Sequence, residues 1–267
     1  MNFCANVSAC SRPNYLYVAL DSIFRNTIVP DVYVYIDIMD NGSNCIEENS
    51  KVVSNFPVKD IIISDKHEDT ANQLWKSFNK SFELGYDYAI YLEEDWLLTT
   101  NAFEWFIKCP KENNLYSLYR WSDRIGFSDS DTVLNNGEFI SWCIATDKIN
   151  FDLVYSFRQS DKLDSYLAQW PEFNKERLLY HDWDRVFIMA SQEYGFTQRV
   201  PSKSLLAHFG NISSIDFGYG AGIDMPDIMF SGDKETWLGN IVNIFNTSSK
   251  EQLDSYRLAP TEGFIYG

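Results

Sequence analysis

The sequence predicts an α/β protein, and three observations support this fold class. Segments with the apolar patterns of strands and of helices alternate through residues 1–110. The helix-like segments carry their apolar residues on one face. Acidic or other polar residues directly follow several of the strand-like segments. Strands that alternate with helices form parallel sheets, which bind ligands at the carboxyl ends of the strands, so these polar residues are candidates for a binding site.

The elements of the first part can be placed in order. Phe3–Ala9 has the composition of a buried strand, and a helix is expected to begin at Arg12-Pro13, because the apolar residues that follow share one helical face. The further expected elements are strands at Val32–Ile36, Asp60–Ser64 and Tyr88–Leu92, a helix at Ala71–Leu84 that Gly85 ends, and a helix after Asn101, with Asn101 and Glu104 as its capping box.

The second part is less regular. The expected elements are strands at Leu115–Arg120 and Phe139–Thr146, a turn-rich stretch at Ser128–Gly137, a helix that begins at His181 or Asp182 and ends at Gly195, and a short strand at Ser204–His208. No internal repeat or low-complexity linker divides the chain, so we expect residues 1–267 to form a single domain.

The composition excludes several classes of partner. The formal net charge is −16, which disfavours nucleic acids and anionic membranes as partners. No run of about 18 apolar residues occurs, so no membrane span is expected. The N-terminus lacks the pattern of a signal peptide, and the five cysteines are scattered without a CxxC pair. We therefore expect a cytoplasmic protein whose cysteines are reduced.

The acidic triplet Glu93-Glu94-Asp95 directly follows the expected strand Tyr88–Leu92. Adjacent carboxylates repel one another unless water or a cation screens them. Asp and Glu oxygens bind hard cations such as Mg²⁺, which also bind phosphate oxygens. The triplet therefore indicates a metal site for a nucleotide diphosphate, with Asp95 as the first candidate ligand. A solvated acidic loop is the alternative interpretation.

Two further strand or helix ends carry candidate residues. His208 ends an expected strand, where its imidazole could complete a Mn²⁺ site or serve a structural role. Asp182 and Asp184 flank Trp183 at the start of an expected helix. Carboxylates there stabilise the helix, and an ionised carboxylate could also act as a general base toward a hydroxyl group.

For two other residues, the sequence pattern alone allows two interpretations. Arg12 could contact a nucleotide or cover a helix end, and Trp142 could contact an acceptor or lie in the core. No GxGxxG, Walker A, HExxH or GxSxG motif occurs, which disfavours dinucleotide, P-loop, zinc-protease and hydrolase sites.

Several segments, in order across residues 3–215, resemble the GT-A glycosyltransferases, in particular the inverting N-acetylglucosaminyltransferases and more loosely the family-2 transferases. Ala9-Cys10-Ser11-Arg12 resembles the opening Ala-Cys-Asp-Arg of that family, whose arginine and backbone hold the nucleotide. Asp37 matches the acidic residue that binds the uracil or ribose, and Asn72 falls where a helix residue reaches the nucleotide. The triplet resembles the Glu-Asp-Asp form of the DxD motif, with Glu94 in place of Asp.

The resemblance continues in the second part. Trp142 falls where a Gly-Trp pair packs near the donor sugar. The segment from His181 to Arg185 resembles Asp-Asp-Trp-Met-Arg, whose second aspartate is the catalytic base, which points to Asp182 rather than Asp184. His208-Phe209-Gly210 resembles a C-terminal metal-site segment. By resemblance, Glu93 and Glu94 would lie near the ribose and donor sugar, while Asp95 and His208 would bind the metal.

The resemblance implies a GT-A fold, with a mixed central sheet flanked by helices. Residues 1–110 would form a nucleotide-binding half, 111–215 an acceptor-side half, and 216–267 a C-terminal tail. The implied reaction is the Mn²⁺- or Mg²⁺-dependent transfer of a hexose, with inversion, from a UDP-glucose or UDP-GlcNAc type of donor to a saccharide or other hydroxyl acceptor. A sugar nucleotidyltransferase and a non-catalytic carbohydrate-binding protein on the same fold remain alternatives.

Overall fold

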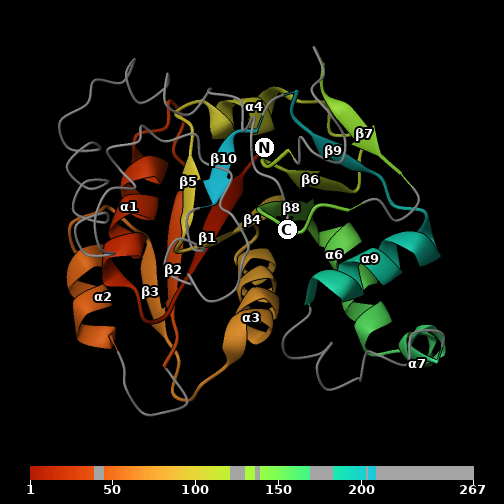
Figure 1. Cartoon of the computed structure of the whole chain (residues 1–267), viewed down its shortest axis with the longest axis horizontal. Coiled ribbons are helices and arrows are strands. Elements are labelled where there is room, and N and C mark those ends of the chain that lie inside the picture. The colour runs from red at the N-terminus through yellow and green to blue at the C-terminus, as the bar shows by residue number, and fades with distance from the viewer. Residues whose placement is uncertain (39–44, 121–129, 136–138, 169–182, 203, 209–267) are drawn as a thin grey trace, which may run out of the picture.

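The computed structural model describes residues 1–38, 45–120, 130–135, 139–168, 183–202 and 204–208. In this part of the chain, strands and helices together form an α/β fold (Figure 1). The strands are β1 (Phe3–Ala9), β2 (Asp31–Ile36), β3 (Asp60–Ile63), β4 (Tyr88–Glu93), β5 (Trp96–Leu98), β6 (Leu115–Ser117), β7 (Thr132–Leu134), β8 (Ile144–Asp147), β9 (Gln198–Val200) and β10 (Leu206–His208).

Eight of the described strands form one mixed sheet in the order β3-β2-β1-β4-β8-β6-β9-β7. The half built from β3, β2, β1 and β4 is parallel, as the alternating pattern predicts. The other half is mixed: β8 runs antiparallel to β4 and β6, whereas β9 is parallel to β6 and antiparallel to β7. A separate antiparallel pair joins β5 and β10. The predicted mixed central sheet is confirmed.

The register of the parallel strands explains where the site lies. Ala9 at the end of β1 pairs with Ile36 at the end of β2, and Ser8 pairs with Glu93 at the end of β4. Because the three strands end level with one another, the segments that follow them leave the sheet at the same edge. Two of those segments contain Arg12 and Asp37, and the third contains the rest of the acidic triplet.

The described helices are α1 (Pro13–Phe24), α2 (Ile46–Val53), α3 (Asp69–Glu83), α4 (Ala102–Lys108), α6 (Lys148–Arg158), α7 (Asp161–Leu167) and α9 (Trp183–Tyr194). Helix α3 packs on β1 and β4, and α2 contacts β2 and β3. The core continues from α3 into the second half through aromatic rings: Trp75 of α3 stacks on Phe187 of α9, with 5.5 Å between ring centroids, and lies 5.9 Å from Phe151 of α6. The aromatic core therefore unites the two halves.

Most predicted elements are confirmed, with shifted ends. The predicted and observed bounds of β1 agree, and α3 begins two residues before the predicted Ala71. Gly85 and Gly195 follow α3 and α9 with positive φ angles of 87° and 67°, which fits their expected role as helix ends.

Two local predictions are wrong. The stretch 128–137 was expected to be turns, but it contains β7, which pairs antiparallel with β9 and whose side chains are partly or fully buried. Asn101 does precede α4, but its side chain makes no capping hydrogen bond, so no capping box forms. Its Oδ1 instead accepts a 2.8 Å hydrogen bond from the hydroxyl of Thr99, and Glu104 accepts one from Thr27.

Candidate active site

Two members of the acidic triplet, Glu94 and Asp95, are buried, and Glu93 is half-buried. Glu93 ends β4, and Glu94 and Asp95 form the turn that leads into β5. Glu94 is only 3% exposed and Asp95 only 5%. A solvated acidic loop would expose these side chains, so that interpretation is wrong. Buried carboxylates need a positive charge or hydrogen-bond donors close by.

Arg12 lies in the loop that follows β1 and supplies this positive charge. Its Nε donates to Oε1 of Glu94 at 2.7 Å, and its Nη2 lies 3.0 Å from Oδ2 of Asp95. The guanidinium also lies over the ring of Tyr15, 4.9 Å from the centroid. The backbone N–H of Cys10 donates to the other oxygen of Glu94 at 2.9 Å. One arginine therefore links the loop after β1 to two members of the triplet.

The protonation of the triplet reflects this crowding. Burial raises the pKa of Glu93 to about 8; the charges of Asp95, Glu94 and Asp184 also raise it, and Arg12 lowers it. Burial also raises the pKa of Glu94, against the opposing effects of Arg12 and the Cys10 N–H. The negative charge at this strand end therefore exceeds what Arg12 neutralises, and an additional proton or cation is favoured here.

A second helix fixes the loop after β1 from the other side. The Nδ2 of Asn49 in α2 donates to the carbonyl oxygen of Cys10 at 2.7 Å, and Asn49 is fully buried. The thiol of Cys45, directly before α2, lies 3.6 Å from the carbonyl oxygen of Ser11. Sequence reasoning missed both contacts, because α2 carries few apolar residues and no motif marks Asn49.

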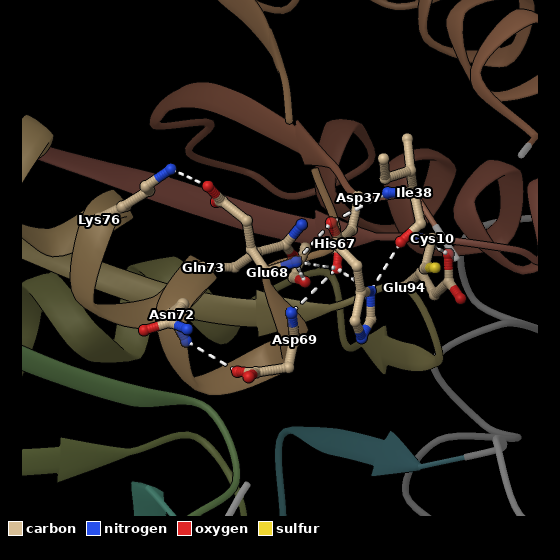
Figure 2. Close-up of polar contacts among 11 residues, drawn as sticks. Cys10, Asp37, Ile38, His67, Glu68, Asp69, Asn72, Gln73, Lys76 and Glu94 are labelled. Carbon is tan, nitrogen blue, oxygen red and sulfur yellow. Dashed lines mark hydrogen bonds and ion pairs between the residues drawn. The ribbon is translucent and has the colours of Figure 1, made fainter. Parts of the chain in front are cut away.

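Asp37 lies at the same edge, held by the start of α3 (Figure 2). Its carboxylate accepts hydrogen bonds from the backbone N–H groups of Glu68 and Asp69 at 3.1 Å, and from that of Ile38 at 2.9 Å. The Nδ1 of His67 lies 3.1 Å from Oδ2 of Asp37 and 2.6 Å from the carbonyl oxygen of Ile38. These contacts fix Asp37 in orientation, and its predicted contact with the uracil or ribose stays a prediction.

The other residues predicted to bind the sugar donor, Asn72 and Trp142, lie in different surroundings. Asn72 is half-buried in the first turn of α3, where its N–H donates to Asp69 at 3.0 Å. Its neighbour Gln73, which sequence reasoning missed, is buried and hydrogen-bonded to Ser8 of β1. Trp142 is half-buried in the turn before β8, with its ring centroid 4.5 Å from that of Tyr119.

The predicted metal ligands are neighbours through strand pairing. In the ladder between β5 and β10, His208 pairs with Trp96, the residue that follows Asp95. Residues 95 and 208 are far apart in sequence, and this register brings their backbones together. The side chain of His208 lies outside the description, so its contact with a metal stays a prediction.

The predicted base lies next to the described chain. Asp182 itself is outside the described residues. The residue after it, Trp183, begins α9, and its ring centroid lies 5.9 Å from that of Tyr91 in β4. The charge of Asp184 reaches Glu93 and raises its pKa. The start of α9 is therefore packed against the strand that carries the triplet.

The donor atoms fit a hard divalent cation. Among the described residues, no three His, Cys, Asp or Glu side chains gather as a complete metal-binding group. Mg²⁺ and similar ions are commonly held by one or two protein carboxylates together with substrate phosphates and water. A carboxylate from Asp95 matches that pattern for Mn²⁺ or Mg²⁺, and the imidazole of His208 would be an additional, nitrogen ligand.

No protein-family model matches the chain, and no curated protein sequence matches it. Solved structures do match its fold. The crystal structure of residues 1–349 of S. aureus TarS is 13% identical, with a TM-score of 0.55; the match covers 97% of this chain and 71% of that one. The same segment of TarS in complex with UDP-GlcNAc is 12% identical, with a TM-score of 0.53 and coverage of 95% and 70%.

A longer TarS structure matches at 11% identity, with a TM-score of 0.55, over 92% of this chain and 43% of its own length. This chain therefore spans less than half of that longer protein. The similarity concerns the fold alone: this chain shares its mixed α/β fold, of the GT-A type, with these TarS structures. No helix in the described ranges is long and apolar enough to cross a membrane.

Proposed function

We propose that this chain is a metal-dependent glycosyltransferase, which moves a hexose from a UDP-sugar to an acceptor hydroxyl group. The observation that carries the proposal is the convergence of Arg12, Asp37 and the acidic triplet at one edge of the parallel sheet. Ligands of open α/β sheets bind at such an edge. The TarS structures with the same fold include complexes with UDP and with UDP-GlcNAc, which supports a UDP-sugar donor.

In the proposed donor site, the nucleotide lies against the end of β1 at Ala9 and the loop after it, which contains Cys10 and Arg12. Asp37 accepts a hydrogen bond from the uridine, and Asn72 donates or accepts another. Asp37 suits this role because backbone N–H groups already hold its carboxylate in one orientation. Preorganised polar groups bind a ligand without the cost of ordering themselves.

Asp95 and His208 are the proposed metal ligands. The strand register that brings their backbones together supports the pair. Mn²⁺ or Mg²⁺, when bound, would neutralise the charge that develops on the departing UDP. Glu93 and Trp142 would lie near the ribose and the donor sugar, as the resemblance of their segments to the GT-A transferases implies.

Asp182 is the proposed general base, and the reaction would invert the anomeric configuration. An ionised carboxylate at the start of α9 would take the proton of the acceptor hydroxyl as its oxygen attacks the anomeric carbon. The packing of Trp183 on Tyr91 supports this role, because it brings the start of α9 to the strand that ends in Glu93. A saccharide or other hydroxyl compound is the proposed acceptor.

The proposal includes a cytoplasmic location, which the five free cysteines support, because thiols stay reduced there.

Melting temperatures with UDP, GDP and CMP, each with and without Mn²⁺, test the donor class. A ligand that binds only the folded state raises the melting temperature. We expect UDP to raise the melting temperature only when Mn²⁺ is present. We also expect the protein to release UDP from UDP-glucose or UDP-GlcNAc. A protein that responds to none of these nucleotides would contradict the proposal.

A further inference from the structure

Glu94 differs from the other members of the triplet in the direction of its contacts. Both of its carboxylate oxygens bind groups of the loop after β1: Oε2 accepts from the Cys10 N–H at 2.9 Å, and Oε1 accepts from Nε of Arg12 at 2.7 Å. The side chain is only 4% exposed. Glu94 therefore contacts the loop that would hold the nucleotide, which argues against the expected direct contact with the ribose or donor sugar.

Arg12 is shared between two carboxylates. Its Nε binds Glu94, and its Nη2 lies 3.0 Å from Oδ2 of Asp95. A planar guanidinium can donate in two directions at once, and the ring of Tyr15 lies against it at 4.9 Å. Two carboxylates and one guanidinium leave one net negative charge to attract a cation.

We propose that Glu94 is a positioning residue that acts through Arg12: by holding the guanidinium, it sets how strongly Asp95 attracts a divalent cation. This inference rests on the proposed function, in which Asp95 is a metal ligand. With Glu94 present, Arg12 divides its charge between two partners. Without that carboxylate, Arg12 pairs with Asp95 alone, and a metal ion must compete with the guanidinium for Asp95.

Substitutions of Glu94 and of Arg12 should change the affinity for Mn²⁺ in opposite directions. Glu94→Gln keeps the size of the side chain and an acceptor for the Cys10 N–H, but it leaves Arg12 to Asp95, so Mn²⁺ binding weakens. Substitution of a residue that contacts a metal ligand typically lowers the metal affinity by about 10-fold or more. Arg12→Met removes the competing cation, so Mn²⁺ binding in the absence of nucleotide becomes tighter.

A double-mutant cycle separates this mechanism from simple loss of charge. If Glu94 acts through Arg12, then Glu94→Gln has little effect when Arg12 is already methionine. If Glu94 instead attracts or contacts the metal directly, its substitution weakens binding by the same factor in both backgrounds. Asp21→Asn is the matched control, because Asp21 pairs with Arg25 at 2.7 Å on α1, outside the site.

The experiment is a Mn²⁺ titration followed by the electron paramagnetic resonance signal of the free ion, with and without UDP. It uses the wild type, the two single variants, the double variant and the Asp21→Asn control, and melting temperatures check that each is folded. We expect about 10-fold weaker binding for Glu94→Gln, tighter binding for Arg12→Met, and a double variant within about twofold of Arg12→Met.

An undiminished effect of Glu94→Gln in the Arg12→Met background would overturn the inference while leaving the metal site intact. If Glu94→Gln does not fold, Arg12→Met decides alone, and unchanged or weaker Mn²⁺ binding by that variant overturns the inference. A wild-type chain that binds no Mn²⁺ even with UDP would contradict the proposed function itself, and the inference with it.

Discussion

His208 pairs with Trp96 across the ladder between β10 and β5, and this pairing places the backbones of the two proposed metal ligands, Asp95 and His208, next to one another. Asp95 directly precedes Trp96, so its backbone lies next to that of a residue more than a hundred positions away. The triplet alone offers Asp95 to a metal. The strand pairing places the backbone of His208 beside that of Asp95, so substitutions of Asp95 and of His208 can each test the proposed pair of ligands.

His208→Ala should weaken the Mn²⁺-dependent part of UDP binding while leaving metal-free binding unchanged. The reason is that the imidazole would contribute only through the metal. Because even the partners of metal ligands change affinity by about 10–100-fold, a loss of at least that size is expected. Calorimetry of UDP with Mn²⁺ and with EDTA measures both parts. Equal affinities of the variant and the wild type with Mn²⁺ would remove His208 from the metal site.

Asp182→Asn should abolish most sugar transfer but preserve UDP binding. General-base assistance typically contributes about 10²–10⁴-fold, and the amide cannot accept the proton. Asp184→Asn is the matched control, because it makes the same change two residues away at the start of α9. Initial rates of UDP release in the presence of acceptor measure the effect. A larger loss in the Asp184 variant than in the Asp182 variant would assign the base to Asp184.

Asn49→Ala should destabilise the protein. The buried Nδ2 donates to the carbonyl oxygen of Cys10 at 2.7 Å, and the substitution leaves that oxygen without this donor. Loss of a buried hydrogen-bond partner costs about 1–3 kcal/mol. Urea denaturation measures the change in the free energy of unfolding. Asn55→Ala is the control, because Asn55 makes a similar bond, to the carbonyl oxygen of Lys51, on an exposed surface. Similar losses in the two variants would refute the role of burial.

Gly85→Ala should also destabilise the protein, and Gly85→Asn should do so less. Gly85 has a φ angle of 87°, and a Cβ there would meet no atom within 4 Å, so any cost comes from the backbone conformation. The left-handed region costs most residues about 1–2 kcal/mol, and asparagine tolerates it better than alanine. Melting temperatures of the two variants rank the costs. A more stable alanine variant would contradict this explanation.

The parallel half of the sheet could be predicted because its strands are continuous apolar runs, and their ends mark where a ligand binds. Ala9, Asp37 and the triplet were placed at one edge on that ground, and the register confirms the placement. The helix α3 was predicted because its apolar face is long and Gly85 ends it.

The rest depends on contacts between distant segments. The pairing of Arg12 with Glu94 joins residues 82 positions apart, and the sequence contains no signal for it. Asn49 lies on a short helix whose apolar residues are too few to show a helical period. The strand β7 has three residues and polar neighbours, so only its pairing with β9 distinguishes it from the turns around it.

The most direct test of the proposed function is isothermal calorimetry of UDP with the wild-type chain and with Asp95→Ala, in Mn²⁺ and in EDTA. On the proposed function, we expect the wild type to bind UDP at least about 10-fold more tightly with Mn²⁺ than with EDTA, and the variant to lose this difference, because Asp95 would hold the metal against the diphosphate. Equal Mn²⁺ dependence in the two proteins, or no binding of UDP by the wild type, would contradict it.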